Sequence, residues 1–231
     1  SFGVPSRKPE IWQQDVKKAI SYAGKGQVLV LSFMGTVKKD QTQKEFVEDF
    51  ILAAKLAYET GARILEANLS CPNIGNEGLV CYNLEVTKQV VEGIRKVIGN
   101  TPLILKIGYY HNENDLEKLA EIANEYANDV AGINTLQAIV VNEVGEQALP
   151  GPNRLRSGVC GYGIKWAGIE IVKKLAQIRK KNKYSFSISG VGGVISVKDY
   201  LEYRQAGADA VMSATGAIWN PYLAQEIKAS K

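Results

Sequence analysis

The stretch SFSISGVGGVISVKDYLEYRQAGADAVMSATGA, residues 185–217, decides the fold. Two short apolar segments, residues 185–189 and 210–214, flank a segment of helical period at residues 197–206. Short β-branched runs that alternate with longer amphipathic runs are typical of successive βα units. Each apolar segment runs into small and glycine residues, SGVGG and ATGA. The stretch therefore predicts two βα units with glycine-rich loops after their strands.

The same alternation covers the rest of the chain. Strands are predicted at residues 28–33, 63–69, 103–107, 130–134, 185–189 and 210–214. Helices are predicted at residues 9–22, 43–58, 84–98, 114–126, 166–179, 197–206 and 221–228, with a long polar loop before residue 166. Because the strands are apolar without alternation, we expect them to be buried on both faces, as in a parallel sheet.

A parallel sheet of this kind is either open and doubly wound or closed into a (β/α)8 TIM barrel. Polar and glycine-rich residues fall at the carboxyl ends of the strands, in NLSCPN, LKIG, INT, SGVGG and SATGA. A barrel carries its active site at this face and commonly binds phosphate with the loops after its last two strands. We therefore expect an α/β fold in which residues 1–231 form a single domain with the last six βα units of a TIM barrel. An N-terminal segment is expected to supply the other two.

The composition excludes several classes of protein. Hydrophobic residues make up 45% and charged residues 23% of 231 residues, which is ordinary for a soluble domain. The net charge of +4 comes with lysines scattered over predicted helices, so no nucleic-acid partner is expected. Three cysteines and one histidine offer little to a disulfide framework or a metal site, and a reducing cytoplasm is expected. The sequence contains no apolar run of about eighteen residues, so no membrane span is predicted.

The segment EANLSCPNIGNEG, residues 66–78, places a thiol among carboxamides where a strand ends. Cys71 at such a position is a candidate base, although a lone cysteine is more simply a small buried hydrophobe. Asn68, Asn73 and Asn134 carry groups that both donate and accept, which suits a flat heterocycle with N–H and C=O edges. Asx turns are the alternative for each asparagine.

A lysine inside an apolar strand and two glycine loops are the other candidates. Lys106 lies in LILKIG, where a buried ammonium group requires an anion, such as a substrate or cofactor. The alternative is a side chain that reaches solvent at the end of the barrel. Gly190, Gly192 and Gly193, with Thr215 and Gly216 after the next strand, predict backbone N–H groups that face an anion. Cys81 and Cys160 lack polar neighbours of this kind and are interpreted as structural.

In order and spacing, ANLSCPN, LKIG, INT, SGVCGYGIKW, SGVGG and ATGA resemble the dihydroorotate dehydrogenases. This resemblance implies a (β/α)8 barrel that holds FMN and oxidises dihydroorotate to orotate in pyrimidine biosynthesis. Cys71 matches the base that takes the C5 proton, and a hydride would pass from C6 to flavin N5. The substrate-binding positions of the family correspond to Asn68, Asn73, Asn134, Thr135 and the backbone of Phe2, Gly3 and Val4. The cofactor-binding positions correspond to Ser32, Asn68, Lys106, Ile133, Gly161, Gly192, Gly193, Ala214 and Thr215.

A cysteine base resembles the soluble, cytoplasmic class of the family, which implies a homodimer. Its electron acceptor would be fumarate, or NAD through an iron–sulfur partner subunit. The chain departs from the family pattern in three respects: Ala214 replaces a usual glycine, the IGNEGLVCYN loop has an uncommon form, and the first two strands are not in the sequence.

Two other interpretations remain open. A related flavin barrel of the dihydropyrimidine dehydrogenase type, acting on uracil or thymine, shares NLSCP but usually has histidine where this chain has Asn73. The second alternative is that the chain is a truncated, non-catalytic barrel fragment. Turnover with dihydrouracil would identify the first, and the intact mass and absorption spectrum of the protein would identify the second.

Overall fold

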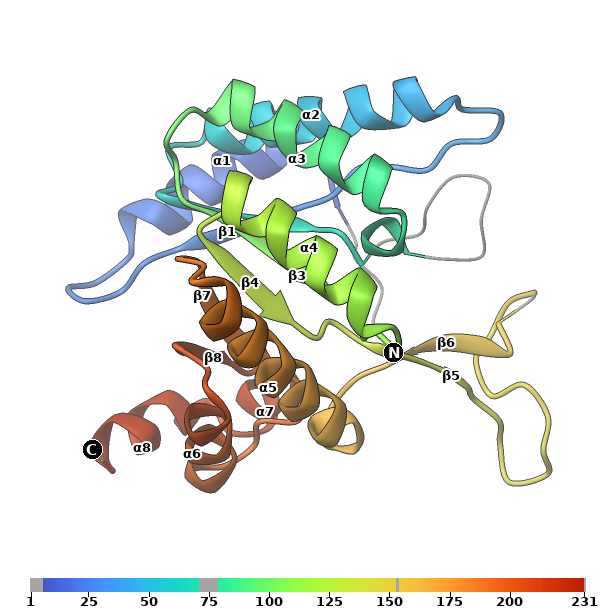
Figure 1. Ribbon diagram of the computed structural model, residues 1–231, viewed down its shortest axis with the longest axis vertical. Coiled ribbons are helices and arrows are strands. Elements are labelled where there is room, and N and C mark those ends of the chain that lie inside the picture. Colours follow the sequence, from blue (N-terminus) through green and yellow to red (C-terminus); the bar gives the residue numbers. More distant parts are fainter. Residues whose placement is uncertain (1–5, 71–78, 153, 231) are drawn as a thin grey trace.

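The computed structural model describes residues 6–70, 79–152 and 154–230 (Figure 1). Four of the residues singled out above, Gly3, Val4, Cys71 and Asn73, lie outside the described residues, as does Phe2. The role of Cys71 therefore stays a prediction.

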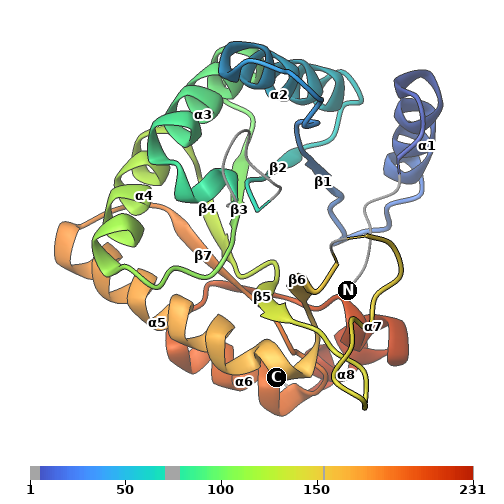
Figure 2. The ribbon, with the colours of Figure 1, turned by 90° about the vertical axis from the view of Figure 1, so that its right-hand side faces the viewer.

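Six strands form one parallel sheet. They are β1 (Val30–Phe33), β2 (Ile64–Asn68), β3 (Leu103–Ile107), β4 (Asp129–Gly132), β7 (Ser187–Val191) and β8 (Ala210–Met212). Their order in the sheet is β1-β2-β3-β4-β7-β8, which is their order along the chain, and every neighbouring pair is parallel. The sheet is curled (Figure 2). Six parallel strands in chain order, as predicted, form an arc of an α/β barrel.

Helices cover the convex side of the arc, as Figure 2 shows. They are α2 (Gln43–Tyr58), α3 (Leu84–Ile98), α4 (Glu113–Tyr126), α5 (Lys165–Asn182) and α6 (Val197–Ala206). The remaining helices are α1 (Pro9–Ser21), α7 (Thr215–Trp219) and α8 (Leu223–Ala229), with short 3₁₀ turns η1 (Val80–Tyr82) and η2 (Tyr162–Ile164). Side-chain caps mark several starts: Thr42 and Glu45 form a capping box at α2, and Ser196 caps α6.

The main hydrophobic core lies between the sheet and these helices. Leu65, Leu105 and Ile188 of the strands are fully buried there against Phe50 of α2 and Leu175 of α5. Because side chains alternate along a strand, the residues between them face the concave side. The register of the strands places Ser32, Glu66, Lys106, Asp129 and Ser189 on that concave face. The two faces therefore differ: the helix side is packed with apolar side chains, and the concave side carries polar groups beside a smaller apolar cluster of Ile104, Ala131 and Val191.

An antiparallel hairpin replaces part of the loop predicted before α5. β5 (Leu136–Ile139) pairs with β6 (Arg156–Val159), and the hairpin projects from the body of the molecule (Figure 1). The prediction of a polar loop was wrong for these residues. Most of the described segment between the strands is exposed, backbone pairing joins the two strands, and the opposed Leu136 and Val159 pack against the main core.

Candidate active site

Ser32, Glu66 and Lys106 form a polar cluster on three neighbouring strands. The Ser32 hydroxyl donates to Glu66 Oε1 at 2.8 Å, and Lys106 Nζ lies 3.7 Å from the same oxygen. The side chains of Lys106 and Glu66 are 13% and 8% exposed. Lys106 is thus largely buried rather than extended into solvent, and the structure supplies an anionic partner within the chain, Glu66, that was not predicted from the sequence. A contact between Lys106 and a cofactor stays a prediction.

Asn68 lies at the end of β2, on the same face as Glu66 and opposite Lys106 in the register. Its Oδ1 accepts hydrogen bonds from the Ser70 hydroxyl at 2.6 Å and the Ser70 N–H at 3.2 Å. Its Nδ2 is 3.9 Å from Met34 Sδ, which is a weak acceptor. The carboxamide oxygen therefore makes the turn contact that was weighed as an alternative, while the N–H₂ group keeps donor capacity beside Lys106.

The residues after β4 continue along the same edge. Ile133 donates its N–H to the Val191 carbonyl at 3.0 Å and is buried, and Asn134 donates its N–H to the Ile107 carbonyl at 2.9 Å. The Asn134 and Thr135 side chains are partly exposed. Thr135 packs on Gly158 of β6, where a Cβ would lie 2.6 Å from Thr135 Oγ1. The hairpin, which the sequence did not predict, thus contacts one of the predicted substrate-binding residues.

Backbone hydrogen bonds tie the described residues on either side of 71–78 to β3. Leu69 donates to the Lys106 carbonyl and accepts from the Cys81 N–H, both at 2.9 Å. Cys81 is fully buried, its Sγ accepts from the Gly108 N–H at 3.4 Å, and its carbonyl accepts from the Tyr110 hydroxyl. The structural interpretation of Cys81 is consistent with these contacts.

Three glycine-containing loops converge at the ends of β6, β7 and β8. A Cβ on Gly161 would lie 3.5 Å from Thr215 Oγ1, and a Cβ on Gly193 would lie 3.0 Å from the Tyr162 backbone. A Cβ on Gly216 would lie 2.1 Å from the Val194 carbonyl oxygen. The sequence predicted these segments as two walls of one site, and the structure brings them together with Ala214, which precedes α7.

Backbone conformation also requires glycine here. Gly192 and Gly193 have φ values of +120° and +68°, and Gly161 has +89°, a region that L side chains rarely adopt. Tight loops of this kind leave room for the backbone N–H groups to approach an anion.

Asp129, the first residue of β4, is a second buried carboxylate on the concave face. Asp129 Oδ2 accepts from the Ser189 hydroxyl at 3.0 Å, whereas Oδ1 has no hydrogen-bond partner among the described residues. Burial raises the pKa of Asp129 to about 6, and the Ser189 hydrogen bond opposes the rise. Asp129 and Glu66 were both absent from the sequence-based candidates. A lone charged residue in an apolar strand, the signal that identified Lys106, was available for Glu66, whereas Asp129 lies just before the strand predicted at residues 130–134 and begins β4 in the structure.

The described part of the chain contains no group of three or more His, Cys, Asp or Glu residues that could hold a metal ion. Among its helices, none combines the length and apolar character needed to cross a membrane.

Comparison with known proteins places the chain among relatives of one kind. The family described as "Dihydroorotate dehydrogenase" matches residues 10–230. The chain is 34% identical over 232 residues to a dihydroorotate dehydrogenase of Dictyostelium discoideum, covering 98% of this chain and 61% of the relative. It is 31% identical to the catalytic subunit of dihydroorotate dehydrogenase B (NAD(+)) of Oceanobacillus iheyensis, covering 78% and 57% of the two chains. A fumarate-type dihydroorotate dehydrogenase A of Limosilactobacillus reuteri is 27% identical, covering 81% and 58%.

A crystal structure of dihydroorotate dehydrogenase from Eimeria tenella in complex with ferulenol shares the fold, with a TM-score of 0.75 and 18% identity. That match covers 98% of this chain and 64% of the other. The chain therefore spans about three fifths of the length of these relatives. Since the family match covers nearly the whole sequence, the chain belongs to the dihydroorotate dehydrogenase family.

Proposed function

We propose that the protein is a flavin-dependent oxidoreductase that oxidises dihydroorotate to orotate in pyrimidine biosynthesis. The observation that supports this most directly is the buried Lys106 beside Glu66 and Asn68 at the carboxyl ends of β2 and β3. A fixed positive charge at this face suits a reaction in which negative charge develops on a bound ring. The family match over residues 10–230 supplies the substrate class.

FMN is the proposed cofactor, and the residues present are compatible with it. Gly193 and Gly216 lie where any Cβ would collide with neighbouring residues, so the three loops form a glycine-lined cradle of the kind that accepts a phosphate. Thr215 adds a hydroxyl group, and Gly161 lies against it. Ser32, Lys106 and Ile133 are the proposed contacts of the ring system. When bound, a flavin would supply the acceptor for the hydride that the substrate loses.

Cys71 is proposed to remove the C5 proton of the substrate, while the hydride leaves from C6. The proposed grips on the pyrimidine ring are Asn68, Asn73, Asn134 and Thr135, with the backbone of Gly3 and Val4. Lys106 would stabilise the negative charge that a bound flavin gathers on reduction, because an ammonium group in a partly buried site interacts strongly with an anion. These roles rest on the motif match and on the position of Lys106, Asn68 and Asn134 at one edge of the sheet.

The electron acceptor is proposed to be fumarate, or NAD through an iron–sulfur partner subunit. Relatives whose names include each acceptor match the chain at similar identity. A cytoplasmic homodimer also stays a prediction, which sedimentation equilibrium and cell fractionation would test.

An absorption spectrum tests the proposal. The protein, expressed at the full length of its gene, is expected to show the bands of oxidised flavin or to acquire them on incubation with FMN. Dihydroorotate added without oxygen is expected to bleach those bands. If the full-length protein neither contains nor takes up FMN, the proposed function is ruled out. That result would support the alternative of a non-catalytic barrel.

Substrate choice needs a separate measurement. Bleaching by dihydrouracil but not by dihydroorotate would assign the protein to the dihydropyrimidine dehydrogenase type instead. Asn73 favours dihydroorotate, since the rival family usually carries histidine there.

A further inference from the structure

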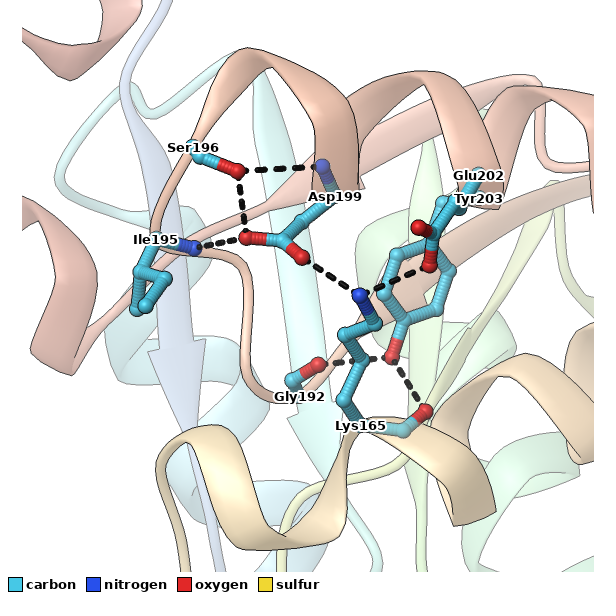
Figure 3. A network of polar contacts seen from close by, with 7 residues as sticks. All are labelled: Lys165, Gly192, Ile195, Ser196, Asp199, Glu202 and Tyr203. Atoms are coloured by element: carbon cyan, nitrogen blue, oxygen red, sulfur yellow. Dashed lines mark hydrogen bonds and ion pairs between the residues drawn. The ribbon is translucent and has the colours of Figure 1, made fainter.

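The loop between β7 and α6, residues 192–196, is contacted by the side chain of Tyr203 of α6 (Figure 3). The Tyr203 hydroxyl lies 2.7 Å from the Gly192 carbonyl oxygen and 3.1 Å from that of Val191. The tyrosine is fully buried, and a Cβ on Gly190 would lie 2.3 Å from its ring. One buried hydroxyl thus lies within hydrogen-bond distance of the carbonyls of Val191 and Gly192, and it also lies 3.5 Å from the Lys165 carbonyl oxygen.

Asp199 holds the other end of the same loop. Its Oδ2 accepts hydrogen bonds from the Ile195 N–H at 3.1 Å and from the Ser196 hydroxyl at 2.8 Å. The Asp199 N–H in turn bonds to Ser196 Oγ at 3.3 Å. These hydrogen bonds fix the backbone conformation of Ile195 and Ser196, where the loop leads into α6.

Lys165, at the start of α5, compensates the charge of that carboxylate. Its Nζ is 2.5 Å from Asp199 Oδ1 and 2.7 Å from Glu202 Oε2, as Figure 3 shows. The Lys165 and Asp199 side chains are 15% and 4% exposed. Burial alone lowers the pKa of Lys165, but the hydrogen bonds to Asp199 and Glu202 outweigh it and raise the pKa above its ordinary value. Lys165 is therefore a cation at neutral pH.

The held loop is the middle member of the three that converge. A Cβ on Gly193 would lie 2.7 Å from Lys165 Cβ, and the Val194 carbonyl accepts from the Ser213 hydroxyl at 2.7 Å. The same loop thus contacts the segment before α5 and the segment before α7. Its backbone path sets how the glycine cradle is shaped.

The charge of Asp199 and the backbone path of the 192–196 loop would both affect an anion bound at the loop. Without Lys165, Asp199 would be a buried, uncompensated anion directly behind the loop, and it would repel a second anion held in front of it. Without the Tyr203 hydroxyl, the Gly192 carbonyl would lose its partner, and the loop would be free to adopt other paths.

We propose that Lys165, Asp199 and Tyr203 are positioning residues for the phosphate group of the cofactor: Asp199 and Tyr203 shape the 192–196 loop, and Lys165 offsets part of the negative charge of Asp199 and Glu202. This inference rests on the proposed function, because it takes FMN to be the ligand. It concerns residues that do not themselves touch the cofactor, and it predicts an effect confined to the phosphate end of the molecule.

The test compares FMN with riboflavin, which has the same ring system and no phosphate. The full-length protein is freed of flavin, and each ligand is titrated while its fluorescence is followed. The wild-type protein is expected to bind FMN more tightly than riboflavin. Lys165→Met is expected to weaken FMN binding by roughly tenfold, the effect of one uncompensated like charge in a partly buried site. Riboflavin affinity is expected to stay within about twofold.

Two variants serve as controls. Lys165→Arg keeps the charge and is expected to retain most of the FMN affinity. Lys174→Met breaks a similar ion pair on α5, between Lys174 and Glu170 at 2.7 Å, and is expected to change neither affinity. Tyr203→Phe removes one oxygen atom and is expected to lower the FMN-to-riboflavin affinity ratio about threefold or more. It decides the question if Lys165→Met does not fold.

The outcomes separate the two proposals. A wild-type protein that binds neither flavin would overturn the proposed function, and this inference with it. A wild-type protein that binds FMN, combined with variants in which both affinities fall equally or the ratio does not change, would overturn the positioning role alone.

Discussion

Glu66 and Lys106 are best understood as one unit, because each is buried and each is the other's charged partner. Among the described residues, Lys106→Met would leave the Glu66 carboxylate with the Ser32 hydrogen bond alone. We expect the free energy of unfolding to fall by about 2 to 3 kcal/mol, somewhat less than for a tight buried pair because the two atoms are 3.7 Å apart. Urea unfolding at neutral pH measures the change.

A matched control separates burial from charge in that experiment. Lys44→Met breaks the exposed pair of Lys44 and Glu48 and is expected to cost less than about 0.5 kcal/mol. Adding Glu66→Gln to Lys106→Met is expected to recover part of the loss. Equal losses for Lys44→Met and Lys106→Met would show that Glu66 is not destabilised by losing its cation.

Asp129 predicts a pH dependence of stability. Its pKa in the folded protein is about 6, above the ordinary value of 3.8, so the folded state holds the proton more tightly than the unfolded state. The free energy of unfolding should therefore fall as the pH rises from about 4 to about 7, by up to about 3 kcal/mol from this group. Urea unfolding across this range measures it, and Asp129→Asn is expected to flatten the slope. An equal slope in the variant would contradict the assignment.

Glu66 and Asp129 also show what sequence reasoning missed at the scale of residues. Lys106 stood out because a cation in LILKIG is costly to bury, and the same logic applies to Glu66 in ILEAN. What the sequence alone lacked was the register, which pairs Asn68 with Lys106. Glu66 lies two residues before Asn68 on the same face, and the register therefore places it near Lys106. The pairing of strands is a tertiary fact, so the partner could not be read from either strand separately.

At the scale of elements, the convergence of the glycine loops makes a sharp prediction. Gly216→Ala would place a Cβ 2.1 Å from the Val194 carbonyl oxygen, so the loop before α6 must move. We expect a loss of about 1 to 3 kcal/mol in the free energy of unfolding. On the proposed function, FMN affinity should fall as well. Thermal unfolding and FMN titration measure the two effects.

Gly163→Ala is the control for that change. Gly163 lies in η2, close in sequence to the same cradle, but a Cβ there meets nothing within 4 Å. It is expected to leave stability and FMN affinity nearly unchanged. If Gly216→Ala behaved like Gly163→Ala, the close packing of the 194 and 216 segments would not limit the site.

The elements themselves were predictable to different degrees. The boundaries of α2 and α3 match the prediction at residues 43–58 and 84–98, because each has a clear apolar face and a side-chain cap at its start. The hairpin of β5 and β6 was missed because its strands are short and the long segment between them has no periodic pattern. It is held by backbone pairing, by the contact of Thr135 with Gly158 and by the packing of Leu136 and Val159 on the core, and strands of four residues are too short to leave a clear periodic signal.

At the scale of the whole molecule, the order of strands was predictable and the asymmetry of the sheet was not. Repeated βα units imply parallel strands in chain order, which the structure confirms. The expectation that both strand faces are buried holds for the middle strands, whose concave side carries a second apolar cluster of Ile104, Ala131 and Val191. The asymmetry is that buried polar side chains also lie on the concave side, whereas the main apolar core lies on the helix side. The proposed site depends on that asymmetry, because it brings residues from β1, β2, β3 and the loops after β7 and β8 to one edge.

Ligand binding should therefore stabilise the molecule as a whole. On the proposed function, FMN bridges the Lys106 side of the sheet and the glycine cradle, so it binds only the folded chain. At about 100 times the dissociation constant, FMN is expected to add about 2.7 kcal/mol to the free energy of unfolding. For a chain of this size, that corresponds to a rise of roughly 5 to 10 °C in Tm. Differential scanning fluorimetry of the full-length protein, read from tryptophan emission, measures the shift. Adenosine monophosphate, which carries a phosphate without the flavin ring, should produce almost none, and an equal shift with both ligands would reduce the site to a phosphate cradle that does not recognise the flavin ring.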